Sequence, residues 1–301
     1  MREPPLIRLL ADGRRVHLHD GPIDLILEAW GAPAAVRAAH RAAAVRMNGL
    51  LDELCEELAI LRAPAGSLSP IPQGPVAARM CAAVRPYADD TFITPMAAVA
   101  GAVAEAVLAA MAAAAPLDRA YVNNGGDIAL HLAPGERFVT GLIDRPDHPS
   151  LIGTAVVEAR DAVRGIATSG RHGRSFSLGI ADAVTILATG AADADAAATI
   201  VANAVDLPGH PDIVRVPADS LDPNSDLGSR LVTRDVAVLP APERDQALQA
   251  GLHRAAGLIA AGRIVAASLH LQGATRTIGK LDHVSPMTHQ ATEPVRRMHH
   301  A

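Results

Sequence analysis

The chain has 301 residues, of which half are hydrophobic and only 2% are aromatic, and its formal net charge is −5. This length suffices for one large domain or two modest ones, with a core built mainly from Ala, Val, Leu and Ile. The charge balance disfavours a nucleic-acid-binding protein, because phosphate backbones are bound by a basic face. The two cysteines form no cluster, so neither a disulfide framework nor a thiolate zinc site is indicated.

The chain contains a single lysine, Lys280, which stands at the edge of a polar tail. A P-loop, a protein kinase and a pyridoxal enzyme each need a lysine in the folded core, so these classes are excluded. Phosphate recognition must then rely on arginine, backbone N–H groups, helix N-termini or a metal ion. The N-terminal residues lack the apolar segment of a signal peptide, and the long apolar runs are interrupted by Asp, Glu or Pro. We therefore expect a cytoplasmic protein that does not span a membrane.

The first part of the chain predicts strands and then helices. Residues 6–30 are expected to form strands joined by turns, and Asp12-Gly13 is a hairpin signal. His17 and His19 share one strand face, where an exposed hairpin surface is favoured over a pair of metal ligands. Helices are predicted over 33–62, over 76–84 and from Thr94-Pro95 onward through an alanine-rich run.

In the remainder of the chain, hydrophobic and polar residues largely alternate with a period of two, which is typical of strands. Strands are expected near 118–123, 127–132, 136–143, 153–159, 162–167, 181–188, 212–218, 231–239 and 263–273, and helices over 191–205 and 243–262. Groups of strands in meander-like order, separated by helix pairs, predict an α+β fold with antiparallel sheets and helices packed on them. We expect a single domain over residues 1–274 and a flexible polar tail over residues 275–301.

Three motifs are candidates for one site. In YVNNGGDIAL (121–130), the glycines are typical of a hairpin turn, but they also allow a ligand to approach the backbone, with Asp127 accepting hydrogen bonds from a ring N–H or a ribose. In GIATSGRHGRS (165–175), hydroxyls and arginines indicate either a local turn or an anion site. In ADAAAT (194–199), Asp195 and Thr199 share a helix face. Either an aspartate caps this helix, or Asp195 and Thr199 ligate Mg²⁺.

The order of these motifs, GGD, then ATSG, then AD-x-x-x-T after the strand VTILA, resembles the ApbE family, which includes the FAD:protein FMN transferases. Further segments, GPIDLILEA, FITPMAAVAGAVAE and GRIVAASLHLQG, are similar to a cytoplasmic ApbE-like subfamily of unknown activity, and the resemblance covers roughly residues 20–273. It implies a fold related to the tunnelling fold and an FAD site with Mg²⁺. The implied flavin contacts are Asn124, Gly125, Gly126, Asp127, Ala167, Thr168, Ser169, Gly170 and Arg171, the implied magnesium ligands are Asp195 and Thr199, and His172 is the candidate catalytic residue.

The chain departs from the transferases after ATSG. Their His-Ile-x-Asp-Pro-x-Thr-Gly segment is missing, and RHGRSFSLGIADA leads directly to Val184. Three functions therefore stay open. The first is Mg²⁺-dependent transfer of FMN to a hydroxyl group, which can belong to a protein. The second is use of the same pocket for a pterin-type ligand, since the subfamily is associated with tetrahydromethanopterin-linked one-carbon metabolism. The third is a binding protein with a relic site.

Two further expectations concern the ligand and the assembly. Aromatic residues are few, and Tyr121 and Phe176 flank the first two motifs in sequence, which makes them candidates for stacking on a ligand ring. The alanine-rich helices would suit a homodimer interface, although they would suit a core equally well.

Overall fold

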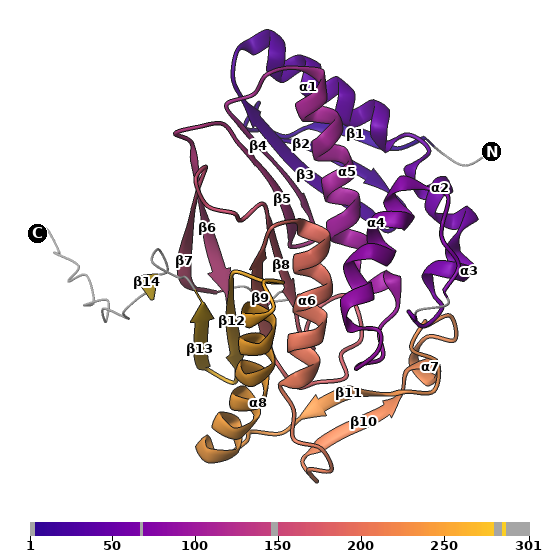
Figure 1. Ribbon diagram of the computed structural model, residues 1–301, viewed down its shortest axis with the longest axis vertical. Coiled ribbons are helices and arrows are strands. Elements are labelled where there is room, and N and C mark those ends of the chain that lie inside the picture. The colour runs from indigo at the N-terminus through magenta and orange to yellow at the C-terminus, as the bar shows by residue number, and fades with distance from the viewer. Residues whose placement is uncertain (1–3, 67–68, 146–149, 280–284, 287–301) are drawn as a thin grey trace, which may run out of the picture.

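The computed structural model describes residues 4–66, 69–145, 150–279 and 285–286. Nine strands form one sheet in the order β1-β2-β3-β4-β5-β8-β9-β12-β13, and every neighbouring pair is antiparallel (Figure 1). The predicted α+β fold with antiparallel strands is therefore confirmed. The strands of this sheet are β1 Leu6–Leu9, β2 Val16–Asp20, β3 Ile23–Trp30, β4 Arg119–Asn124, β5 Asp127–Leu132, β8 Gly165–Ser169, β9 Ala183–Ala188, β12 Ala266–Leu271 and β13 Ala274–Gly279.

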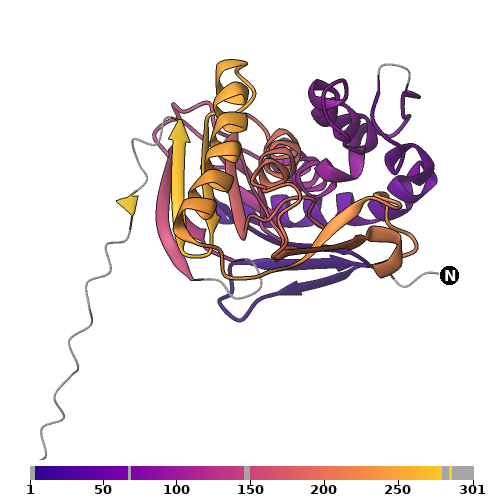
Figure 2. The same ribbon diagram turned by 90° about the horizontal axis from the view of Figure 1, so that it is seen from below.

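The helices cover one face of this sheet, as the view from below shows (Figure 2). Helix α5 lies over β4 and β5, and α6 lies over β8 and β9. The helical elements are α1 Pro33–Met47, α2 Leu50–Glu56, α3 Leu58–Leu61, α4 Pro75–Val84, η1 Arg85–Tyr87, η2 Pro95–Ala98, α5 Val99–Ala114, α6 Ala191–Ala204, α7 Ala218–Leu221 and α8 Ala241–Ala260.

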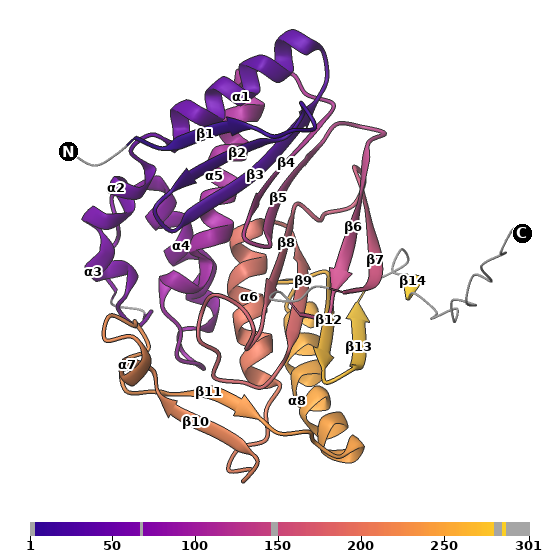
Figure 3. The same cartoon turned by 180° about the vertical axis from the view of Figure 1, so that it is seen from behind.

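The opposite face of the sheet is partly covered by a second, three-stranded sheet of β6 (Arg137–Ile143), β7 (Leu151–Glu158) and β14 (Ser285–Pro286) (Figure 3). Two apolar clusters result. The larger one lies between the main sheet and the helices, and the smaller one joins β6 and β7 to β5, β8, β9 and β12. Because both faces are covered there, every residue of β9 and of β12 is buried. A separate hairpin pairs β10 (Ile213–Pro217) with β11 (Leu231–Val236).

Three sequence expectations need correction. The strands do not form simple meanders, because β5 pairs with β8 while the intervening β6 and β7 form their own sheet. The helix expected from Thr94-Pro95 begins with a 3₁₀ turn, and its α-helical part starts at Val99. Ordered structure also continues past residue 274, since β13 pairs with β12 as an edge strand. The rest of the predicted flexible tail lies outside the described residues, except the two residues of β14.

Helix α5 with the preceding 3₁₀ turn, Pro95–Ala114, is long and apolar enough to cross a membrane by length and composition, with a mean hydropathy of 1.9. Seven of its residues between Gly101 and Met111 are buried, and it packs against α1, α6, β4 and β5. The apolar composition is therefore accounted for by its place in the core of the fold.

Two glycines allow helix α6 to contact its neighbours backbone to backbone. A Cβ atom added to Gly101 of α5 would lie 2.2 Å from the carbonyl oxygen of Ala191, and one added to Gly165 of β8 would lie 2.1 Å from the carbonyl group of Gly190. No side chain fits either position without a shift of the backbone. The start of α6 is therefore fixed against both α5 and the sheet.

The glycine contacts predict that Gly101→Ala destabilises the fold although alanine has the higher helix propensity. We expect a loss of about 1–3 kcal/mol in the free energy of unfolding, the usual cost of overpacking. The matched control is Gly257→Ala in α8, where an added Cβ meets nothing within 4 Å. That change should stabilise the protein by about 0.5–1 kcal/mol. Urea unfolding of both variants provides the measurement, and equal effects of the two would contradict this account of α6 packing.

Candidate functional site

Two carboxylates converge between the sheet and the helices. Asp127 is the first residue of β5, and its Oδ1 accepts a hydrogen bond of 3.2 Å from the backbone N–H of Thr168 on β8. Asp195 lies in the second turn of α6, and its Oδ2 accepts a hydrogen bond of 3.0 Å from the N–H of Gly101 in the first turn of α5. The structure thus brings the GGD motif, the ATSG motif and the AD-x-x-x-T motif into one place.

The electrostatics of this pair are unusual. Burial raises the pKa of Asp127 to about 7, against the opposing effects of the Thr168 N–H and the Arg174 guanidinium. Burial also raises the pKa of Asp195 well above its usual value, and the negative charge of Asp127 raises it further. Two like charges in a poorly solvated place disfavour double ionisation, so the pair tends to retain a proton near neutral pH.

The GGD turn is both a hairpin turn and an anchor for α5. Gly125 and Gly126 have φ angles of 65° and 117°, which favour glycine, and the N–H of Gly126 donates to Oδ1 of Asn123 at 2.8 Å. The buried Asn124 donates from Nδ2 to the carbonyl oxygen of Ala100 at 3.2 Å. The turn chemistry expected from the sequence is therefore present, and the same residues position the start of α5 beside Asp127.

The ATSG residues divide between the two faces of the sheet. Ala167 is buried on the helix face, whereas the Oγ1 of Thr168 lies 2.9 Å from the Oγ1 of Thr185 on β9. Thr168 therefore contributes its backbone N–H, rather than its hydroxyl, to the site around Asp127. An added Cβ on Gly170 would lie 2.4 Å from the carbonyl oxygen of Asp182, so glycine is required where this loop crosses the start of β9.

Arg171 and His172 turn toward Asp182. Nε and Nη2 of Arg171 lie 2.9 and 2.8 Å from Oδ1 of Asp182, and Nε2 of His172 lies 3.2 Å from the same oxygen. The other oxygen of Asp182 accepts a hydrogen bond from the backbone N–H of Gln272, just after β12. No motif in the sequence pointed to Asp182 as the residue that fixes this loop.

The start of α6 shows that the simple capping interpretation of the AD-x-x-x-T motif is wrong. The N-cap residue Gly190 makes no side-chain cap, Asp193 pairs with Arg79 at 2.5 Å, and Asp195 bonds to α5. The first turn of α6 receives its acceptor from Glu105 of α5, whose Oε1 lies 3.0 Å from the N–H of Ala192. Each of the two helices therefore supplies a carboxylate to the N-terminus of the other.

Thr199 lies one turn after Asp195 on α6 and is partly exposed, as is Ser169 at the end of β8. Asp195, with a hydroxyl one turn away on the same helix and the charge of Asp127 acting on it, belongs to a set of hard oxygen donors of the kind that Mg²⁺ prefers. A divalent cation would also favour the ionised forms of both Asp127 and Asp195. Asp195, Thr199 and Asp127 are accordingly the residues that could hold a metal ion here.

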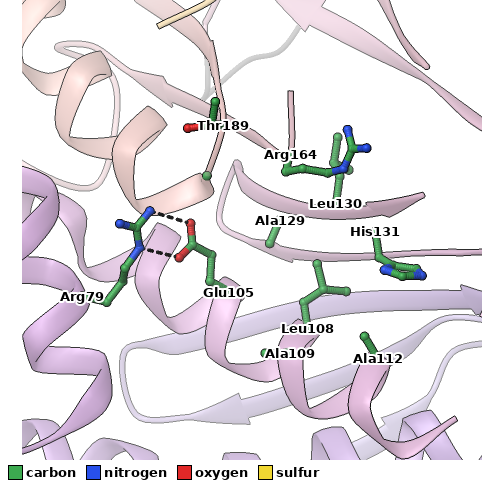
Figure 4. A pocket seen from close by; sticks show the side chains of 11 residues that line it. Arg79, Glu105, Leu108, Ala109, Ala112, Ala129, Leu130, His131, Arg164 and Thr189 are labelled. Carbon is green, nitrogen blue, oxygen red and sulfur yellow. Dashed lines mark hydrogen bonds and ion pairs between the residues drawn. The ribbon is translucent and has the colours of Figure 1, made fainter. Parts of the chain in front are cut away.

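A pocket of about 390 Å³ lies at a different place, between α5, β5 and the residues that precede α6. Leu108, Ala109 and Ala112 of α5 form one wall, and Arg79, paired with Glu105, stands at one end (Figure 4). None of the predicted flavin-contacting, magnesium-binding or catalytic residues lines it, although Ala129 and Leu130, at the end of the segment 121–130, do. The stacking candidate Tyr121 is also remote from the carboxylates, because it packs with Trp30 and Phe138 and borders the apolar cluster on the opposite face of the sheet.

The raised pKa of Asp127 predicts a pH-dependent stability. The native state retains a proton that the unfolded chain releases, so this contribution is fully present below about pH 4 and is lost as the pH rises through about 7. Asp127→Asn keeps the acceptor for Thr168 but removes the titration. We expect the variant to gain on the order of 1–2 kcal/mol relative to wild type between about pH 5 and pH 8, measured by urea unfolding. The exposed Asp89→Asn serves as the control, and parallel curves for all three proteins would contradict the assignment.

Comparison with known proteins identifies the family of the chain. Residues 7–277 match the family described as AbpE bacteria, an ApbE-related family. Among curated relatives, a UPF0280 protein of Methanopyrus kandleri is 39% identical over 142 residues, which are 47% of this chain and 53% of that protein. A UPF0280 protein of Methanosarcina acetivorans is 40% identical over 114 residues, 38% of this chain and 44% of that protein. The chain spans about half the length of the curated relatives it matches. Because the family match extends over most of its length, the chain belongs to the AbpE bacteria family and is an ApbE-like protein.

Proposed function

We propose that this protein binds a flavin nucleotide, FAD, together with Mg²⁺ at the junction of the GGD turn, the ATSG strand and α6. The observation that carries the proposal is the convergence of Asp127 and Asp195, two carboxylates whose pKa values are both raised by burial. Such a pair is costly in an empty site and becomes favourable when a divalent cation binds. The motif order that defines the resemblance supports FAD as the nucleotide.

The chain's own residues would divide the work as follows. Asp195 and Thr199 would hold the ion, which would supply positive charge toward the diphosphate when FMN passes to a hydroxyl oxygen and AMP leaves. The Thr168 N–H keeps Asp127 in place, and Asn124 holds the GGD turn against α5. Arg174 contributes a positive charge close to Gly125. A Cβ atom added to Gly125 would lie 3.5 Å from Cζ of the Arg174 guanidinium. With no lysine among the described residues, arginine and the ion would supply the positive charge toward phosphate.

His172 is the proposed proton acceptor for the attacking hydroxyl. Asp182 orients its ring through Nε2, in the way a carboxylate orients a catalytic histidine. The acceptor would be a small molecule or a protein hydroxyl, and we place the reaction in the cytoplasm. His172→Gln should then leave FAD binding unchanged while lowering transfer.

A pterin is the second candidate ligand. The observation in its favour is Asp127 itself, because a carboxyl group can pair with the ring N–H and amino groups that a pterin presents side by side. Asp127→Asn should weaken pterin binding more than FAD binding, since FAD is also held through its diphosphate. Thermal-shift measurements with both ligands distinguish the two candidates.

The proposal predicts that FAD binds tightly only in the presence of Mg²⁺. Fluorescence quenching should show at least a tenfold tighter dissociation constant with Mg²⁺ than with a chelator, and Asp195→Ala should abolish this difference. Because Asp195 also bonds to α5, Thr199→Val provides a second variant with little effect on folding. Asp193→Asn, on the same helix but paired with Arg79, is the matched control and should retain the full Mg²⁺ effect. Absence of FAD binding in large excess would overturn the proposal.

A further inference from the structure

Three potential metal ligands lie together on the face of the sheet opposite the helices. His17 and His19 are on β2 and Asp24 is on β3, where His19 and Asp24 are directly opposite each other in the register. One ligand atom from each of the three residues lies within 4.8 Å of the others. Nε2 of His17 is 2.6 Å from Oδ1 of Asp24, and the two imidazole rings are 6.1 Å apart between centroids.

The backbone fixes this arrangement more firmly than a surface cluster on loops. Residues two apart on a strand share a face, and directly paired residues on antiparallel strands have Cβ atoms about 4.5–5.5 Å apart. Val16 and Leu18 alternate with the histidines, and Leu25 follows Asp24; all three are buried under the helices and hold β2 and β3 in register. The three ligands therefore lie on two rigid, hydrogen-bonded strands, β2 and β3.

The donor set is that of a transition-metal site. Two imidazole nitrogens and one carboxylate oxygen are ligands for Zn²⁺ and for Fe²⁺ in open sites. Tetrahedral Zn²⁺ with bonds of about 2.0–2.1 Å requires donor atoms about 3.4 Å apart. Small side-chain rotations convert the observed spacing to that value, with the proton between His17 and Asp24 released on binding.

The surroundings leave the site accessible. His19 is exposed, while about a quarter of the His17 side chain and a third of the Asp24 side chain are exposed. Two cations face the cluster. Arg8 pairs in register with His17 from β1, and Nη2 of Arg174 is 3.7 Å from Oδ2 of Asp24. Both arginines are exposed, so their attraction to Asp24 is weak and readily displaced by a divalent ion.

We propose that His17, His19 and Asp24 form a binding site for a divalent transition-metal ion, with Zn²⁺ as its probe, and with at least one coordination position open to solvent. This site shares no ligand with the one proposed around Asp195 and Thr199, although Arg174 lies close to both Asp24 and Gly125. It lies on the opposite face of the sheet, and it uses nitrogen donors that Mg²⁺ does not prefer.

The test is a titration of metal-free, full-length protein with Zn²⁺ alone, in competition with a chromophoric chelator. Wild type should bind one equivalent of Zn²⁺ at least tenfold more tightly than the double variant His17→Gln/His19→Gln. Asp24→Asn should weaken the same equivalent. His210→Gln is the matched control, since His210 also pairs with a carboxylate, Glu243 at 3.1 Å, but belongs to no group of three potential ligands among the described residues. It should bind Zn²⁺ as wild type does.

Co²⁺ provides an independent readout. Its visible absorption in wild type should show a site of low coordination number with nitrogen and oxygen ligands, and this absorption should be absent in the double variant. The closing histidines, His299 and His300, are common to all variants, so any binding there is equal in every titration. Equal Zn²⁺ affinity in wild type and in the double variant would overturn the proposal, as would an equal loss in His210→Gln. His19→Gln alone, at an exposed position, gives the same comparison if the double variant unfolds.

Discussion

The close contact between the starts of helices α5 and α6 determines the rest of the site. Gly101 and Gly165 let the first turn of α6 lie directly against α5 and β8, where any side chain would collide with backbone. Once the helices meet there, Glu105 of α5 caps α6 and Asp195 of α6 bonds to α5. Asp195 is thereby held beside Asp127 at the start of β5. The pair of carboxylates follows from the packing of two helices against glycines.

This origin gives Asp195 two roles. As an acceptor for the Gly101 N–H, it stabilises the junction of the two helices, because a negative charge near the N-terminus of a helix is favourable. As a neighbour of Asp127, it carries a charge that the buried surroundings disfavour, which is why its pKa is raised. A bound cation would offset the unfavourable charge beside Asp127 and would leave the hydrogen bond to Gly101 in place. The proposed ligand site and the fold therefore depend on the same residue, and Thr199 is better suited than Asp195 to separate binding from folding.

The sequence predicted the elements more fully than their partners. The Asp12-Gly13 turn, the alternation in residues 127–132 and the alanine-rich run 191–205 depend on local chemistry, and each forms the expected element. The β5–β8 pairing depends on contacts between residues distant in sequence. The edge strand β13 has no regular alternation of buried and exposed residues, so its sequence resembles that of a flexible tail. Likewise, motif order indicated that Asp127, Thr168 and Asp195 would meet. Nothing local identified Asp182 as the partner of Arg171 and His172, or Asp24 as the third member of the His17 and His19 cluster.

The carboxylate pair is the central claim, and a carbon-13 NMR titration of the aspartate carboxyl groups tests it most directly. Without a divalent cation, Asp127 should titrate near neutral pH, with a pKa of about 7, and Asp195 should titrate well above an ordinary aspartate. With Mg²⁺ present, both pKa values should fall, because the ion favours the ionised forms. Titration of both groups at ordinary aspartate values, unchanged by Mg²⁺, would contradict the account.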